Sequence, residues 1–100
     1  LLANPKYTVY FSSLTIWEVA IKHAKGALRM PPDLLRDQSL QAGLLELPFT
    51  TVHAVRAGQL PLRHQDPFDR GLVGQAVAES FVLVSQDEKI RLYDVPLRYF

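Results

Sequence analysis

Three acidic residues fall where the sequence pattern changes from a strand to a helix. Glu18 follows the β-branched and aromatic segment 7–13, Asp69 opens an apolar helical segment, and Asp87 follows the apolar run 81–85. The carboxyl ends of parallel strands share one edge of a sheet, where ligands bind. Carboxylates in a chain without cysteine favour a hard cation, Mg²⁺ or Mn²⁺. The three acids are therefore predicted to meet in one metal site.

Each acid also has a simpler interpretation as a residue that stabilises a helix start. Thr15 and Glu18 have the spacing of a capping box. Asp66 precedes Pro67 and is expected to cap the next helix, with Asp69 as an acid that favours the helix dipole. Asp87 is placed to cap a short helix near residue 88. Capping does not require three acids to share one sheet edge, which favours the site.

Nearby basic and hydroxyl side chains also have two interpretations each. Lys22, Lys25 and Arg29 form either a basic strip near the site or a solvated helix face. Ser85 either hydrogen-bonds a site carboxylate or simply ends a strand.

The three histidines carry weaker signals. His64, close to Asp66, is either a metal or phosphate ligand or a solvated loop residue. His23 and His53 are interpreted as helix-surface or boundary residues.

The elements that must position these residues alternate along the chain. Hydrophobic periodicity, proline, glycine and capping residues predict strands at 7–13, 44–49, 81–85 and 96–100, and helices at 15–25, 31–43, 50–58, 66–80 and 86–93. Asp66 is predicted to be an N-cap that accepts a hydrogen bond from the amide of Phe68 or Asp69. This order indicates an α/β domain with a mostly parallel sheet.

Composition limits the function further. One hundred residues form a single domain, 1–100, and 11 basic against 10 acidic residues exert no strong pull on nucleic acid or membrane as a whole. The absence of cysteine excludes disulfides and thiolate metal sites, and fits a reducing compartment. No apolar run approaches the length of a membrane span, so no membrane role is expected.

The segments "FSSLTIWEVAIKHAKGAL", "HQDPFDRGLVGQA" and "LVSQDEKI", in this order, resemble the PIN-domain ribonucleases. The closest resemblance is to the VapC-type toxins of bacterial toxin–antitoxin pairs. It implies a three-layer α/β/α fold and a cytoplasmic RNA endonuclease that depends on Mg²⁺ or Mn²⁺. It also implies RNA and an antitoxin as partners, and a homodimer.

The resemblance assigns roles residue by residue. Glu18, Asp69 and Asp87 match the family's catalytic and metal-binding acids, and Ser85 stands at its hydroxyl position. Asp66 matches an acid common in the "HxDPFDR" subgroup, and is expected to support the site mainly by starting the helix. Lys22 and Arg70 are predicted to hold RNA phosphates.

The sequence departs from the family pattern at its start. The family usually opens with a strand ending in an aspartate, followed by two helices, and Leu1 and Leu2 resemble the tail of the second helix. We expect that strand and its acid either to be supplied from elsewhere or to be missing from an inactive form. The alternative function is therefore a catalytically incomplete binding module that engages an antitoxin or another copy of itself.

Overall fold

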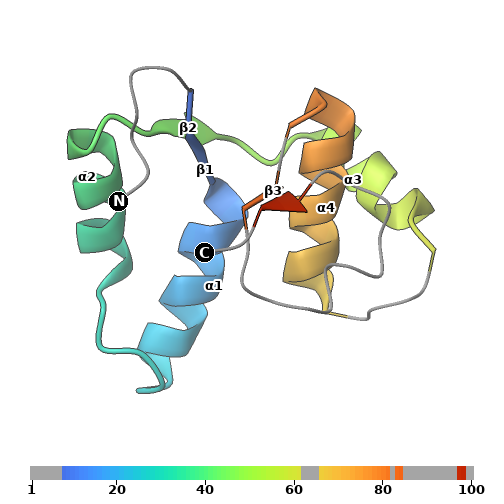
Figure 1. The fold of residues 1–100 in the computed structure, drawn as a ribbon. Helices are drawn as coiled ribbons and strands as arrows, with labels where there is room; N and C mark the ends of the chain where they lie inside the picture. Colours follow the sequence, from blue (N-terminus) through green and yellow to red (C-terminus); the bar gives the residue numbers. More distant parts are fainter. Residues whose placement is uncertain (1–7, 62–65, 82, 85–96, 99–100) are drawn as a thin grey trace. The chain divides into compact units, whose positions relative to one another are not determined.

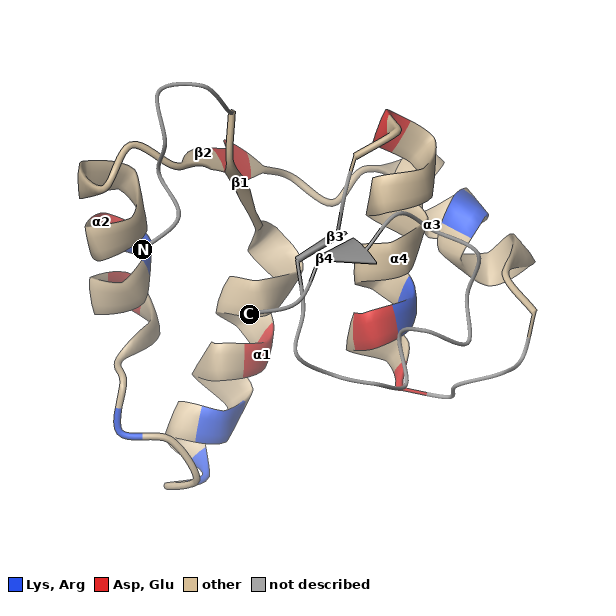
Figure 2. Ribbon diagram, viewed as in Figure 1, with Lys and Arg blue, Asp and Glu red and all other residues tan. Residues whose placement is uncertain are grey.

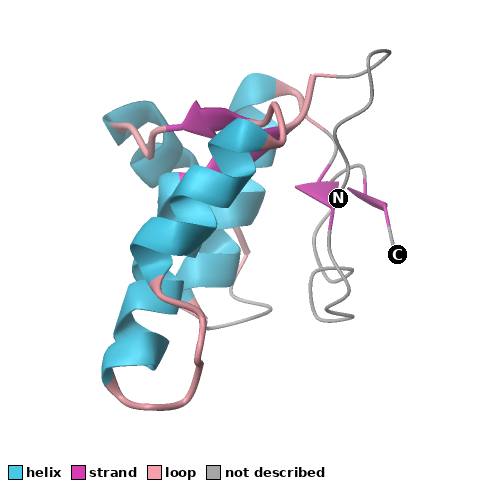
Figure 3. Cartoon of the chain, turned by 90° about the vertical axis from the view of Figure 1, so that its left-hand side faces the viewer, coloured by secondary structure: helices cyan, strands magenta, loops and turns pink. Residues whose placement is uncertain are grey.

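A computed structural model describes residues 8–61, 66–81, 83–84 and 97–98 (Figure 1). Helices make up most of this described part (Figure 3). The chain forms two compact units, Leu1–Pro48 and Phe49–Phe100. The elements are β1 (Tyr10–Ser12), α1 (Ser13–Ala24), α2 (Pro32–Gln41), β2 (Leu45–Leu47), α3 (Thr51–Gln59), α4 (Pro67–Glu79), β3 (Leu83–Val84) and β4 (Leu97–Arg98).

The first unit is a parallel strand pair connected by two helices. β1 and β2 pair in parallel, with Tyr10 opposite Leu45 and Ser12 opposite Leu47. Parallel neighbours need a long crossover connection, which α1 and α2 supply here. Helix α1 contacts both α2 and β1. The predicted strand–helix–helix–strand order is confirmed for this half of the chain.

Helix α1 begins earlier than its capping-box pattern predicts. Ser12 is the N-cap, and its side chain accepts a hydrogen bond from the amide of Leu14 at 3.1 Å. The prediction of Thr15 and Glu18 as a capping box is wrong. β1 ends at Ser12, and a helix that starts at once buries Leu14 to 8% exposure. That burial favours the earlier start.

Both helices of the first unit end at a glycine with positive φ. Gly26 has φ +77° and Gly43 has φ +88°. After α1, Gly26 donates to the carbonyl of His23 at 3.0 Å and Ala27 donates to that of Lys22 at 2.8 Å. This pair of bonds is the Schellman motif, which satisfies the last helical carbonyls. The predicted stops of both helices at glycine are confirmed.

The second unit pairs α3 with α4 and β3 with β4. β3 and β4 are parallel, with Leu83 opposite Leu97. The two helices run antiparallel, because His53 near the start of α3 contacts Glu79 at the end of α4, while Arg70 near the start of α4 contacts the carbonyl of Leu60 just after α3. Parallel pairs in both units confirm the predicted α/β class.

The backbones of α3 and α4 approach each other closely at Gly74. A Cβ built there would meet the backbone nitrogen of Ala57 at 2.7 Å and its Cα at 2.8 Å. Real side chains essentially never approach that closely. Beside this contact, Val73 and Ala76 are buried at 0% and 4% exposure. Only glycine at position 74 allows the two backbones to pack at this distance.

The remaining element predictions are confirmed where the structure describes them. α3 is capped by Thr50, although it ends at Gln59 rather than at Gly58. The predicted helix 86–93 lies outside the described residues. No helix in the described ranges is long and apolar enough to cross a membrane.

Candidate functional site

Glu18 lies in the second turn of α1, within the first unit. The helix starts at Ser13 and its first turn contains no acid, so placing Glu18 in that turn was wrong. The helix dipole therefore contributes little to Glu18, because its effect falls off within the first turn.

Lys22 forms an ion pair with this carboxylate. Its Nζ lies 3.1 Å from Oε2 of Glu18, one helical turn away, and the side chains are 51% and 25% exposed. Exposed pairs of this kind contribute about 0.3–0.5 kcal/mol. The ammonium therefore holds Glu18 weakly and can be displaced by a stronger positive charge.

Further basic residues continue from Lys22 past the end of α1. Lys25 and Arg29 are both exposed. Figure 2 shows blue positions at the C-terminal end of α1 and in the segment that leads to α2. The predicted basic strip is thus solvent-accessible, which RNA phosphates would require.

The start of α4 carries the second predicted acid, within the second unit. Asp66 is the N-cap, and its Oδ1 accepts from the amides of Phe68 at 2.9 Å and Asp69 at 3.1 Å. Pro67 occupies the first helical position, where its missing N–H costs nothing. The predicted N-cap is confirmed, and both amides that were predicted as possible donors bond to Asp66. Asp69 is the third helical residue, half-buried, in the first turn as predicted.

The side chain of Arg70 contacts the end of α3. Its Nη1 donates to the carbonyl of Pro61 at 3.0 Å, and its Nη2 donates to those of Ala57 at 2.9 Å and Leu60 at 3.2 Å. Ala57 lies in the last turn of α3, where its carbonyl also accepts from the amide of Leu60 at 3.4 Å, and the carbonyls of Leu60 and Pro61 lie just beyond the helix. The guanidinium therefore has a structural task within this unit. Its predicted contact with RNA stays a prediction.

A buried histidine joins the other end of the same two helices. His53 is 1% exposed, so its interpretation as a surface or boundary residue was wrong. Its Nδ1 accepts from the amide of Thr50 at 3.0 Å, and Nε2 of Gln75 lies 3.2 Å away. Because Nδ1 accepts, Nε2 carries the proton and donates to Glu79 Oε1 at 2.8 Å. Thr50 and His53 form a capping box in the structure, but the sequence signature of that motif has Glu or Gln where His53 stands, so the pattern did not reveal it.

The third predicted acid cannot be placed beside the others. Asp87 and Ser85 lie outside the described residues. Among the residues that are described, no three His, Cys, Asp or Glu side chains form a group that could hold a metal. The donor chemistry nevertheless fits a hard cation, because Glu18 and Asp69 offer carboxylate oxygens and the chain has no cysteine.

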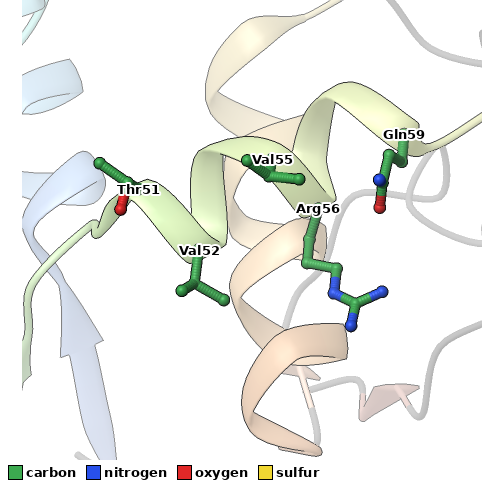
Figure 4. Close-up of a pocket in the computed structure, with 5 residues that line it drawn as sticks. All are labelled: Thr51, Val52, Val55, Arg56 and Gln59. Carbon is green, nitrogen blue, oxygen red and sulfur yellow. The ribbon is translucent and has the colours of Figure 1, made fainter.

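A surface pocket lies along α3, away from these acids in the sequence. It is lined by Thr51, Val52, Val55, Arg56 and Gln59 (Figure 4). None of these lining residues is acidic. Val52 and Val55 are 60% and 58% exposed, which gives this face of α3 an apolar stripe.

The sequence comparison now decides the family. The model of the PIN-domain family matches residues 1–96. This chain is a PIN domain. The match spans all three predicted acids, from Glu18 to Asp87, and both parallel strand pairs belong to the α/β fold expected of the family. No curated protein matches the chain. PIN domains are generally nucleases and typically depend on divalent metals, so nuclease activity is the class of function that membership supports.

Proposed function

We propose that this PIN domain is a metal-dependent RNA endonuclease, the toxin component of a VapC-type toxin–antitoxin pair. The observation that carries the proposal is the family match over residues 1–96. That range contains Glu18, Asp69 and Asp87, the three acids that the resemblance assigns to the site. The open basic strip at Lys22, with Lys25 and Arg29 beyond it, supports a polyanionic substrate.

In this proposal Glu18, Asp69 and Asp87 hold Mg²⁺ or Mn²⁺. A bound cation supplies Lewis-acid chemistry, lowering the pKa of water and stabilising charge on a phosphoryl group. The exposed ion pair between Lys22 and Glu18 is weak, so Lys22 would be available to an RNA phosphate if Glu18 served as a metal ligand. Asp66 fixes where α4 starts, and Ser85 would support one of the carboxylates through a hydrogen bond.

The alternative is a PIN-like module that binds without cleaving. Its partners would be an antitoxin or a second copy of the chain. The exposed Val52 and Val55 on α3 favour it, because an apolar stripe of this kind suits contact with another protein. Such a module would keep its fold and show no cleavage of RNA.

The test is RNA cleavage by the purified chain with Mg²⁺ or Mn²⁺, repeated after chelation. We expect cleavage that chelation abolishes and added metal restores. Asp69→Asn should lower kcat roughly 100-fold, the scale seen when one electrostatic partner of a transition state is removed. Asp33→Asn is the matched control, because Asp33 is also an acid in the first turn of a helix, and it should leave kcat unchanged. A wild-type chain that folds but does not cleave would support the binding module instead.

A further inference from the structure

Arg70 joins the first turn of α4 to the last turn of α3. Two of its terminal nitrogens donate to three carbonyls, those of Ala57, Leu60 and Pro61, at 2.9–3.2 Å. Carbonyls at the end of a helix carry partial negative charge, which a guanidinium complements. The residue therefore acts as a C-terminal cap for α3 that is supplied by α4.

The position of this contact matters because Asp69 is the preceding residue. Successive side chains leave a helix about 100° apart, so fixing Arg70 against α3 fixes the rotation of the first turn of α4. Asp66 fixes the start of the same turn through the amides of Phe68 and Asp69. Together these two contacts fix the position at which α4 starts and the rotation of the turn that carries Asp69.

We propose that Arg70 is a positioning residue for Asp69. The inference rests on the proposed nuclease function, in which Asp69 is a catalytic carboxylate. Arg70 acts on the reaction through the turn that it holds. A displacement of about 1 Å in a reacting group can lower a rate roughly 100-fold, so loss of this hold should be visible in kcat.

The guanidinium is required for this task. Arginine presents five donors in a rigid planar fork, whereas lysine presents three donors from one point on a flexible stem. Three carbonyls reached by two nitrogens match the fork. Lysine at position 70 keeps the charge and reaches fewer of the acceptors.

The experiment compares Arg70→Ala and Arg70→Lys with Glu79→Ala in the full chain. Glu79 accepts from His53 at 2.8 Å, so its loss weakens the same helix pair at the opposite end. We expect Arg70→Ala to lower kcat roughly 10- to 100-fold with KM changed less than about threefold. Arg70→Lys should recover part of kcat. Amide hydrogen exchange in the first turn of α4 should accelerate in Arg70→Ala and stay unchanged in Glu79→Ala.

Three results would overturn the inference. A raised KM with unchanged kcat and a shallower salt dependence would show that Arg70 contacts RNA directly. Equal loss of kcat in Arg70→Ala and Glu79→Ala would show only a loss of stability. Unchanged amide exchange in Arg70→Ala would show that the turn is not held by this residue. If the wild-type chain cleaves no RNA, the proposed function fails separately, and amide exchange still decides whether Arg70 holds the turn.

Discussion

Replacement of Gly74 by alanine tests the packing that holds α3 against α4. The added Cβ would lie 2.7–2.9 Å from three atoms of Ala57, two of them backbone, while ordinary contact begins at 3.4 Å. α3 would have to move by several tenths of an ångström, because its backbone has no side-chain rotamer through which to yield. That movement would also strain the bonds of Arg70 and of His53 at the two ends of the pair.

The expected magnitude follows from opposing effects. Overpacking costs about 1–3 kcal/mol, and each weakened hydrogen bond adds about 0.5–1.5 kcal/mol. Alanine in a helix interior recovers about 1 kcal/mol relative to glycine. With one hydrogen bond weakened at each end of the pair, we therefore expect a net loss of about 1–5 kcal/mol in the free energy of unfolding. In a domain of this size each kcal/mol lowers Tm by about 4–8 °C.

The assay is thermal and urea unfolding of Gly74→Ala beside Gly58→Ala. Gly58 lies in α3, and a Cβ there would meet nothing within 4 Å. The same chemical change at Gly58 should therefore be neutral or stabilising by up to about 1 kcal/mol. If Gly74→Ala were as stable as the wild type, α3 and α4 would not pack as closely as the structure shows.

Two further substitutions test helix ends in α4. Asp66→Ala should lower the free energy of unfolding, measured in urea, by about 0.5–2 kcal/mol, because two amides lose their acceptor. Unchanged stability together with lost Mn²⁺ binding would reverse the roles given to Asp66 and Asp69. Ser80→Gly should stabilise the chain by about 0.5–1 kcal/mol in thermal unfolding, because Ser80 has φ +57°, a left-handed conformation that glycine adopts more readily. A lower Tm for Ser80→Gly would indicate that the serine side chain stabilises this end of α4 by more than its backbone costs.

Helix ends were predictable wherever the signal is local. Asp66 with Pro67, Thr50 before α3 and Gly43 after α2 each act on backbone groups within a few residues, so sequence spacing is enough to identify them. The start of α1 failed because two local signals compete. Ser12 and Thr15 both suit an N-cap, and the burial of Leu14 favours the earlier one.

Contacts between distant residues could not be inferred from local pattern. His53 appears as one polar residue in a short helix, yet its partners Gln75 and Glu79 lie 22 and 26 residues away. Arg70 follows an acid at a helix start and was assigned to RNA, yet its acceptors lie 9–13 residues upstream. The meeting of Glu18, Asp69 and Asp87 is a prediction of the same long-range kind, inferred from their places after predicted strands and from the family resemblance.

The α3–α4 pair links its stability to the placement of Asp69. At one end of the pair, the buried imidazole of His53 on α3 bonds to Glu79 on α4. In the middle, Gly74 packs against the backbone of Ala57, and at the other end the guanidinium of Arg70 on α4 bonds to carbonyls at the end of α3. Because the middle contact involves main-chain atoms of Ala57, α3 cannot shift there without changing the carbonyl that Arg70 holds. A substitution at Gly74 should therefore disturb the first turn of α4, about one helical turn away, as well as the free energy of unfolding. We therefore expect variants of this interface to lose stability and the placement of Asp69 together, whereas Gly58→Ala should lose neither.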